Sequence, residues 1–182
     1  FDALVFAVYE CGFRPRSALE IVDGGEVRLD KICRIIGDCR FSIHDISRTE
    51  LDGPNHLPRF NMPFELGLFL GASRFGAKPQ RAKRCLILDR EQYRYQKFLS
   101  DIAGQDISAH GDKPEAAIRC VRDWLNSASS IGGLPGAAHI TRRYERFVAD
   151  LPALSRDLKL QPDEITFRDL SSLIATWLES FA

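Results

Sequence analysis

The chain has 182 residues, and its 25 basic and 25 acidic side chains give a formal net charge of zero. Hydrophobic residues make up 45% of the sequence and charged residues 27%, proportions typical of a soluble globular protein with one well-buried domain and a small appendage. The balanced charge gives no indication of a nucleic-acid partner or of a membrane surface. No apolar run is long enough to cross a bilayer, and no signal-peptide pattern is present.

The cysteines are odd in number and lack the CxxC spacing of zinc sites and redox motifs. They are Cys11, Cys33, Cys39, Cys85 and Cys120. We expect reduced, buried thiols of a cytoplasmic protein, not a disulfide framework. The histidines also lack the spacing of metal ligands, so no metal site is expected. Because the sequence does not begin with methionine, we expect residues or a further domain to precede it.

The first half of the chain alternates between strand and helix patterns. Residues 3–9 are a short continuous apolar run, which predicts a buried central strand of a parallel sheet. Residues 27–36 have apolar side chains at helical spacing and end at Gly37, so they predict a helix. Residues 41–46 alternate as a second strand does. Residues 47–59 contain glycine and two prolines and predict a long loop, a kind of segment that is often functional.

The same alternation continues along the chain. Residues 61–73 predict a helix with Asn61 as its N-cap. Residues 84–89 form a third apolar run and predict another buried strand. Residues 92–99 predict a short helix, and residues 114–125 predict a longer one with proline in the first turn. Strands that alternate with helices predict an α/β domain with a mostly parallel sheet.

The composition changes at residues 127–136, which are rich in serine and glycine and predict a flexible connector. Two helical stretches follow at residues 139–158 and 166–181, and Thr166 with Asp169 has the pattern of a capping box.

We therefore expect an α/β domain over residues 1–128 and a C-terminal helical hairpin over residues 137–182.

One carboxylate stands out from its surroundings. Glu65 is the only charged residue between Arg59 and Arg74, and apolar side chains fall on every face of this predicted helix. The residue four positions on is Phe69, so no ion pair within the helix compensates the charge. Enclosing a carboxylate is costly because its charged form loses hydration. Glu65 is therefore either paired by another part of the chain, such as Arg59 or Arg48, or kept for chemistry.

Polar and aromatic side chains follow each of the predicted strands. They are Tyr9, Arg14 and Arg16 after the first strand, Asp45 and Ser47 after the second, and Asp89 after the third. In an open parallel sheet, ligands bind beyond the carboxyl ends of the strands. Because the helix with Glu65 begins after the second strand, we expect its first turn to lie at the same edge.

Three short elements resemble the nucleoside 2-deoxyribosyltransferase-like and Toll/interleukin-1 receptor (TIR)-like group of flavodoxin-like domains. They are the turn after the first predicted strand at residues 6–10, the strand end at residues 44–47 and the glutamate helix at residues 64–67. The resemblance covers about residues 3–126. Phe-Asn-Met-Pro at residues 60–63 stands where the transferases often have Asp-Gly-Thr before the glutamate. This departure favours cleavage or ligand binding over deoxyribosyl transfer.

The resemblance implies a flavodoxin-like, doubly wound sheet and an activity at the N-glycosidic bond of NAD or a nucleoside. Glu65 would be the catalytic carboxylate, which stabilises or attacks the anomeric carbon as positive charge develops there. The substrate-binding residues would be Asp45 for sugar hydroxyls, Tyr9 or Phe60 for stacking on the base, Arg14 for phosphates, and Ser47 and Asn61. NAD or the nucleoside would be the substrate, and no cofactor is expected.

The same residues allow a second hypothesis. TIR-like domains serve as enzymes and as interaction modules, so the chain is either a defence or signalling effector that cleaves its substrate or a non-catalytic module that binds a nucleotide-derived ligand or a protein. The alternative for Asp45 is a carboxylate that caps the loop after its strand. We expect a homo-oligomer, because TIR-like enzymes often complete their site between subunits.

Overall fold

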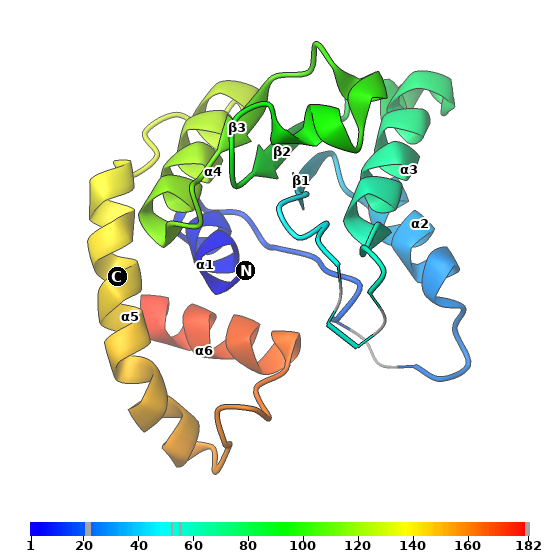
Figure 1. Ribbon diagram of the computed structural model, residues 1–182. Coiled ribbons are helices and arrows are strands. Elements are labelled where there is room, and N and C mark those ends of the chain that lie inside the picture. The colour runs from blue at the N-terminus through cyan, green and yellow to red at the C-terminus, as the bar shows by residue number, and fades with distance from the viewer. Residues whose placement is uncertain (21–22, 52, 55, 181–182) are drawn as a thin grey trace. The chain divides into compact units, whose positions relative to one another are not determined.

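The computed structural model describes residues 1–20, 23–51, 53–54 and 56–180 (Figure 1). In these residues the chain has a mixed α/β fold with six α-helices and a three-stranded parallel sheet. The helices are α1 (Asp2–Glu10), α2 (Arg28–Asp38), α3 (Asn61–Phe75), α4 (Pro114–Ala128), α5 (Ala137–Asp157) and α6 (Phe167–Glu179). The strands are β1 (Phe41–Asp45), β2 (Arg84–Asp89) and β3 (Ile107–Ala109), and the 3₁₀ turns are η1 (Lys78–Ala82), η2 (Arg94–Lys97) and η3 (Ser100–Ile102).

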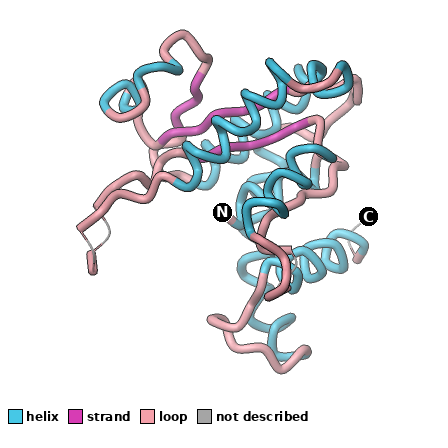
Figure 2. Tube along the Cα trace, turned by 90° about the vertical axis from the view of Figure 1, so that its right-hand side faces the viewer, coloured by secondary structure: helices cyan, strands magenta, loops and turns pink. Residues whose placement is uncertain are grey.

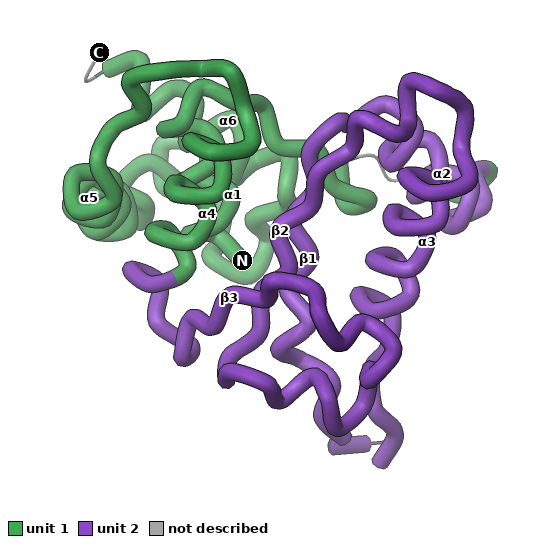
Figure 3. Tube along the Cα trace, turned by 90° about the horizontal axis from the view of Figure 1, so that it is seen from above, with its two compact units in different colours: residues 1–25, 117–182 green, residues 26–116 purple. Residues whose placement is uncertain are grey.

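The chain divides into two compact units, which are coloured separately in Figure 3. Unit 1 consists of residues 1–25 and 117–182, and unit 2 consists of residues 26–116. This grouping differs from the predicted segments 1–128 and 137–182, because the N-terminal residues and most of α4 belong with the last two helices.

The sheet lies in unit 2, and its strands, magenta in Figure 2, pair in the order β1-β2-β3. Asp45 is paired with Leu88, and Asp89 is paired with Ala109. The two longer strands confirm the predictions made from residues 41–46 and 84–89.

One core of unit 2 lies between the sheet and α3. It contains Ile46, Leu66, Ile87 and Tyr95. Helix α3 packs on β1, and α2 packs on α3. Burying these side chains stabilises the unit by about 1.5–3 kcal/mol for each large apolar residue.

Lys83 closes the C-terminal end of α2. Its ammonium group donates hydrogen bonds to the backbone carbonyls of Ile36 and Cys39 and lies 5.1 Å from the ring centre of Phe69 in α3. These contacts satisfy carbonyls that a helix end leaves without partners.

Two local expectations from the sequence, the N-cap of α3 and the burial of the cysteines, are corrected. Asn61 is the first residue of α3 and not its N-cap; that position is held by Phe60, whose side chain makes no capping bond. All five cysteines are free thiols, yet only Cys11 is buried, and Cys33 is exposed. Helix α2 turns Ile32 inward, which leaves the neighbouring Cys33 on the solvent side.

The predicted first strand is wrong, because residues 3–9 lie within helix α1. A short apolar run fits a buried strand and a buried helix equally well. Ala3, Phe6 and Ala7 are buried, and their spacing of three and four positions is that of one helical face.

In unit 1, α1 packs against α5 and α6. The ring of Phe6 lies 5.5 Å from that of Tyr144, 5.4 Å from Phe147 and 5.8 Å from Trp177. Glu10 forms an ion pair with Arg143.

Helices α5 and α6 pack against each other as the expected hairpin. The predicted capping box of Thr166 and Asp169 is present, because each side chain accepts a hydrogen bond from the backbone N–H of the other residue. None of the helices in the described residues combines the length and the apolar character that crossing a bilayer requires.

Candidate functional site

The carboxyl ends of the three strands bring polar side chains from distant parts of the sequence to one edge of the sheet. Asp45 ends β1, Asp89 ends β2, and His110 follows β3. Because the strands are parallel and paired in register, these three residues lie at the same edge. This is the edge at which the sequence predicted a binding site.

A buried ion pair holds the end of β2. Asp89 is fully buried, and its Oδ1 accepts hydrogen bonds from Nε and Nη2 of Arg94 at 2.8 and 2.6 Å. Nη2 also donates to the carbonyls of Ile46 and Ser47, both at 2.9 Å, and Nη1 donates to Oγ1 of Thr49. The guanidinium group therefore connects the loop after β1 to the end of β2. Sequence reasoning missed this role of Arg94, because its partners in the loop after β1 lie 45 to 48 positions away in the chain.

Asp45 is held by two donors. Its Oδ1 accepts a hydrogen bond from the backbone N–H of Ser47 at 3.0 Å and lies 3.4 Å from Nε2 of His110. Nδ1 of His110 accepts a hydrogen bond from the backbone N–H of Asp112 at 3.1 Å, so in the neutral ring the proton is on Nε2, which faces Asp45. The alternative expectation for Asp45, that it caps the loop after its strand, is confirmed by the bond from Ser47.

His44, the neighbour of Asp45, points to the other face of the sheet. Its ring packs edge-on against Phe69 of α3 with 5.6 Å between the ring centres. Burial lowers the pKa of His44 to about 4, because the charged form loses hydration. Neither ring nitrogen has a hydrogen-bond partner in the described part of the chain.

Glu65 is half-buried and is the fifth residue of α3. Among the described residues, none forms a hydrogen bond or an ion pair with its carboxylate, so the alternative of a pair with Arg59 or Arg48 is not found. Burial raises the pKa of Glu65, and the positive charge of Arg28, the first residue of α2, lowers it by a smaller amount. The side chain is thus a partly desolvated carboxylate with a cation in its surroundings but without direct neutralisation.

The other predicted residues of unit 2 lie along the loop that leads to this helix. Ser47 is buried, and its carbonyl is used by Arg94. Phe60 and Asn61 are exposed where α3 begins, one turn before Glu65.

Tyr9 and Arg14 are placed differently from the prediction. Tyr9 lies in α1 and Arg14 lies after it, so neither follows a strand, and both belong to unit 1. The error has the same cause as the mistaken strand at residues 3–9. Their contribution to substrate binding stays a prediction.

Within the residues that the structure describes, no group of three or more His, Cys, Asp or Glu side chains is arranged to hold a metal ion. Comparisons of the chain with models of protein families, with curated proteins and with solved structures find no match. The resemblance to the deoxyribosyltransferase-like and TIR-like group therefore stays a prediction from the sequence.

Proposed function

We propose that the protein cleaves the N-glycosidic bond of NAD or of a nucleoside-type substrate, with Glu65 as the catalytic carboxylate. The observation that supports this is the state of Glu65: half-buried, raised in pKa and without a direct partner among the described residues. A carboxylate in low dielectric attracts a positive charge more strongly than a hydrated one does. The bond to be broken develops such a charge at the anomeric carbon.

In the proposed reaction, the bond between the anomeric carbon and the base nitrogen breaks, and its electron pair leaves with the base. The carboxylate of Glu65 stabilises the positive anomeric carbon or forms a transient ester with it. Water then adds to the anomeric carbon, displaces the Glu65 carboxylate where the ester has formed, and loses a proton, which gives the free sugar hydroxyl. That proton goes to solvent when nicotinamide leaves NAD as a neutral base, and to the base nitrogen when a nucleoside base leaves as an anion. Asp45 would accept hydrogen bonds from sugar hydroxyls, and Phe60 would stack on the base.

We propose that the parallel sheet, together with α2 and α3, belongs to a flavodoxin-like, doubly wound domain. In that arrangement the helix after the first observed strand starts at the carboxyl edge, where ligands bind. We also propose that the protein acts as a homo-oligomeric effector in the cytoplasm.

The test is turnover by Glu65→Gln, which keeps the shape of the side chain and removes its charge. We expect release of nicotinamide from NAD, or of free base from a nucleoside panel, to fall by about 100-fold or more, as when a single stabilising group of an active site is lost. Mass spectrometry of the products identifies the substrate at the same time.

Glu115→Gln is the matched control, because Glu115 is an exposed glutamate in the first turn of another helix. Its turnover should equal that of the unchanged protein. Glu65→Gln should not be less stable to unfolding, because it removes a carboxylate that burial disfavours. Equal turnover in Glu65→Gln and Glu115→Gln would end the assignment of Glu65.

A non-catalytic binding module is the second candidate function. It is favoured by exposed apolar side chains on the loop before α3 and in its first turn. These are Leu51, Leu57, Phe60 and Phe64. These four side chains follow one another along the chain, and exposed apolar surface of this kind is typical of binding sites for other molecules. Binding of a nucleotide-derived ligand or of a protein domain without product formation, unchanged in Glu65→Gln, would select this candidate.

A further inference from the structure

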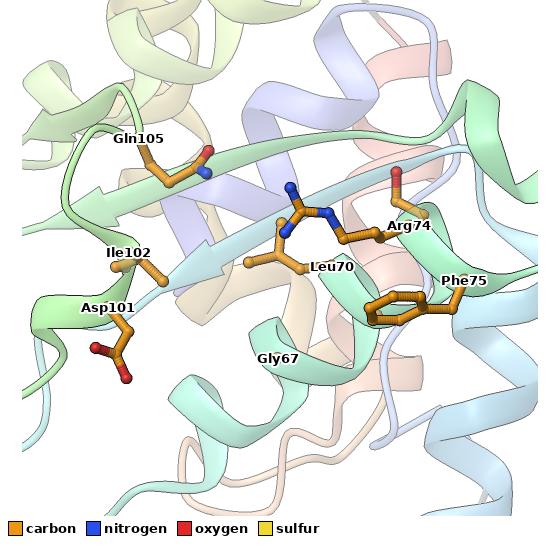
Figure 4. Close-up of a pocket in the computed structure, with 9 residues that line it drawn as sticks. Gly67, Leu70, Arg74, Phe75, Asp101, Ile102 and Gln105 are labelled. Carbon is orange, nitrogen blue, oxygen red and sulfur yellow. The ribbon is translucent and has the colours of Figure 1, made fainter.

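A groove in unit 2 lies along the C-terminal half of α3 (Figure 4). It has a volume of about 420 Å³, which is within the range of roughly 300–1,000 Å³ for small-molecule sites. One wall is formed by α3 and the other by the stretch from η3 to Gln105. Glu65 does not line it, so the groove is separate from the proposed catalytic residue.

The helix side of the groove is open because two of its residues are glycines. Gly67 and Gly71 are one turn apart on α3, and a Cβ atom at either position would meet no atom within 4 Å apart from its chain neighbours and the backbone of its own helix. The space beside the helix backbone is therefore free, and a flat ligand can approach it closely.

A cation extends over this space. Arg74 is exposed, and none of the described residues forms a hydrogen bond or an ion pair with its guanidinium group. In Figure 4, Arg74 and Gln105 extend toward each other from opposite walls. A guanidinium group and a carboxamide can both donate hydrogen bonds to one anion, and the planar fork of arginine fits a phosphate in particular.

Two more groups at the groove complement the rest of a nucleotide. Phe75 follows Arg74 and is 85% exposed, so its ring is available for stacking. The carboxylate of Asp101, on the opposite wall, can accept hydrogen bonds from hydroxyl or amino groups.

The groove has a charged side chain on each wall. Among the described residues that line it, Arg74 is the one cation and Asp101 is the one carboxylate. An anionic group of a ligand is therefore expected beside Arg74, on the wall opposite Asp101.

We propose that this groove binds a nucleotide, with its phosphate on Arg74 and Gln105 and its base stacked on Phe75. Asp101 accepts hydrogen bonds from the ribose hydroxyls. The proposal does not depend on Glu65, and it gives the protein a nucleotide site besides the one proposed for cleavage.

The test is calorimetric titration of the full chain with AMP, adenosine and inorganic phosphate. We expect AMP to bind about tenfold or more tightly than either fragment, since each fragment makes only part of the contacts. Arg74→Gln and Phe75→Ser should each weaken AMP binding by about tenfold or more. Both side chains are exposed, so the melting temperature should not change.

Two matched variants serve as controls. Arg168→Gln removes an exposed arginine from α6, and Phe1→Ser removes an exposed phenylalanine at the start of the chain. Both should bind AMP as the unchanged protein does. Glu65→Gln is measured beside them to report on the proposed catalytic site.

Absence of AMP binding at millimolar concentration would overturn the proposal, and so would equal affinity in Arg74→Gln. Loss of AMP binding in Glu65→Gln with retention in Arg74→Gln would show that the nucleotide binds near Glu65. That result would refute the nucleotide site in the groove and would support the proposed function of Glu65.

Discussion

Glu65 and His44 show the same physical effect with opposite signs. Burial disfavours the charged form of both, so it raises the pKa of the carboxyl group and lowers that of the imidazole. The isolation of Glu65 could be predicted from the sequence, because no charged residue lies near it in its own helix. Its surroundings could not be predicted: Arg28 acts on it from another helix, and only the packing of α2 on α3 brings the two together.

Because His44 is buried in its neutral form, we expect the protein to lose stability toward unfolding in acid. In the folded protein its pKa is about 4, against 6.5 for the free group, so the unfolded chain binds the proton first as the pH falls. The free energy of unfolding should therefore decrease from about pH 6.5 downward, and the loss should be complete near pH 4 at about 3 kcal/mol.

Urea unfolding between pH 7 and pH 4 measures this effect. The variant His44→Leu has no titrating group at this position, so its stability should fall by about 3 kcal/mol less than that of the unchanged protein over the same range. Parallel pH profiles of the two proteins would show that His44 is not buried in its neutral form.

At the scale of the elements, the carboxyl edge of the sheet depends on Arg94. This side chain bonds Asp89, the carbonyls of Ile46 and Ser47, and Thr49, and therefore fixes the start of the loop that leads to α3. Removing one partner of a buried ion pair leaves an uncompensated charge. Arg94→Met should therefore lower the free energy of unfolding by about 3–5 kcal/mol.

Arg90→Met is the matched comparison, four positions away. Arg90 pairs with Glu50 and Glu91, whose side chains are exposed, so its loss should cost less than about 1 kcal/mol. Denaturant unfolding of the two variants gives both values. Similar costs for Arg94→Met and Arg90→Met would mean that the pair with Asp89 does not hold the edge.

The elements that the sequence predicted well are those with a distinctive period or a clear end. Strands β1 and β2 and helix α3 are bounded by glycine, proline and charged residues, and the capping box marks the start of α6. Helix α1 was mistaken for a strand because its apolar run is too short to show a period. The pair of Asp45 and His110 joins residues 65 positions apart, and no local pattern indicates such a contact.

For the whole molecule, the sequence predicted the C-terminal hairpin but not what it covers. Phe6 of α1 packs against Phe147 of α5 and Trp177 of α6, so apolar side chains of the hairpin are used within unit 1. This grouping of the first helix with the last two joins segments that are more than 100 positions apart, which composition and local pattern do not reveal. The expected contact between copies of the chain stays a prediction.

The most direct measurement of the central claim is the titration of the Glu65 carboxyl carbon by NMR. The claim is that this carboxylate is partly desolvated and has no direct counter-charge. Its pKa should therefore lie above the usual 4.5, and Arg28→Gln should raise it further, because the guanidinium charge that stabilises the carboxylate is removed. A pKa at or below 4.5, or no response to Arg28→Gln, would contradict the claim and with it the catalytic role of Glu65.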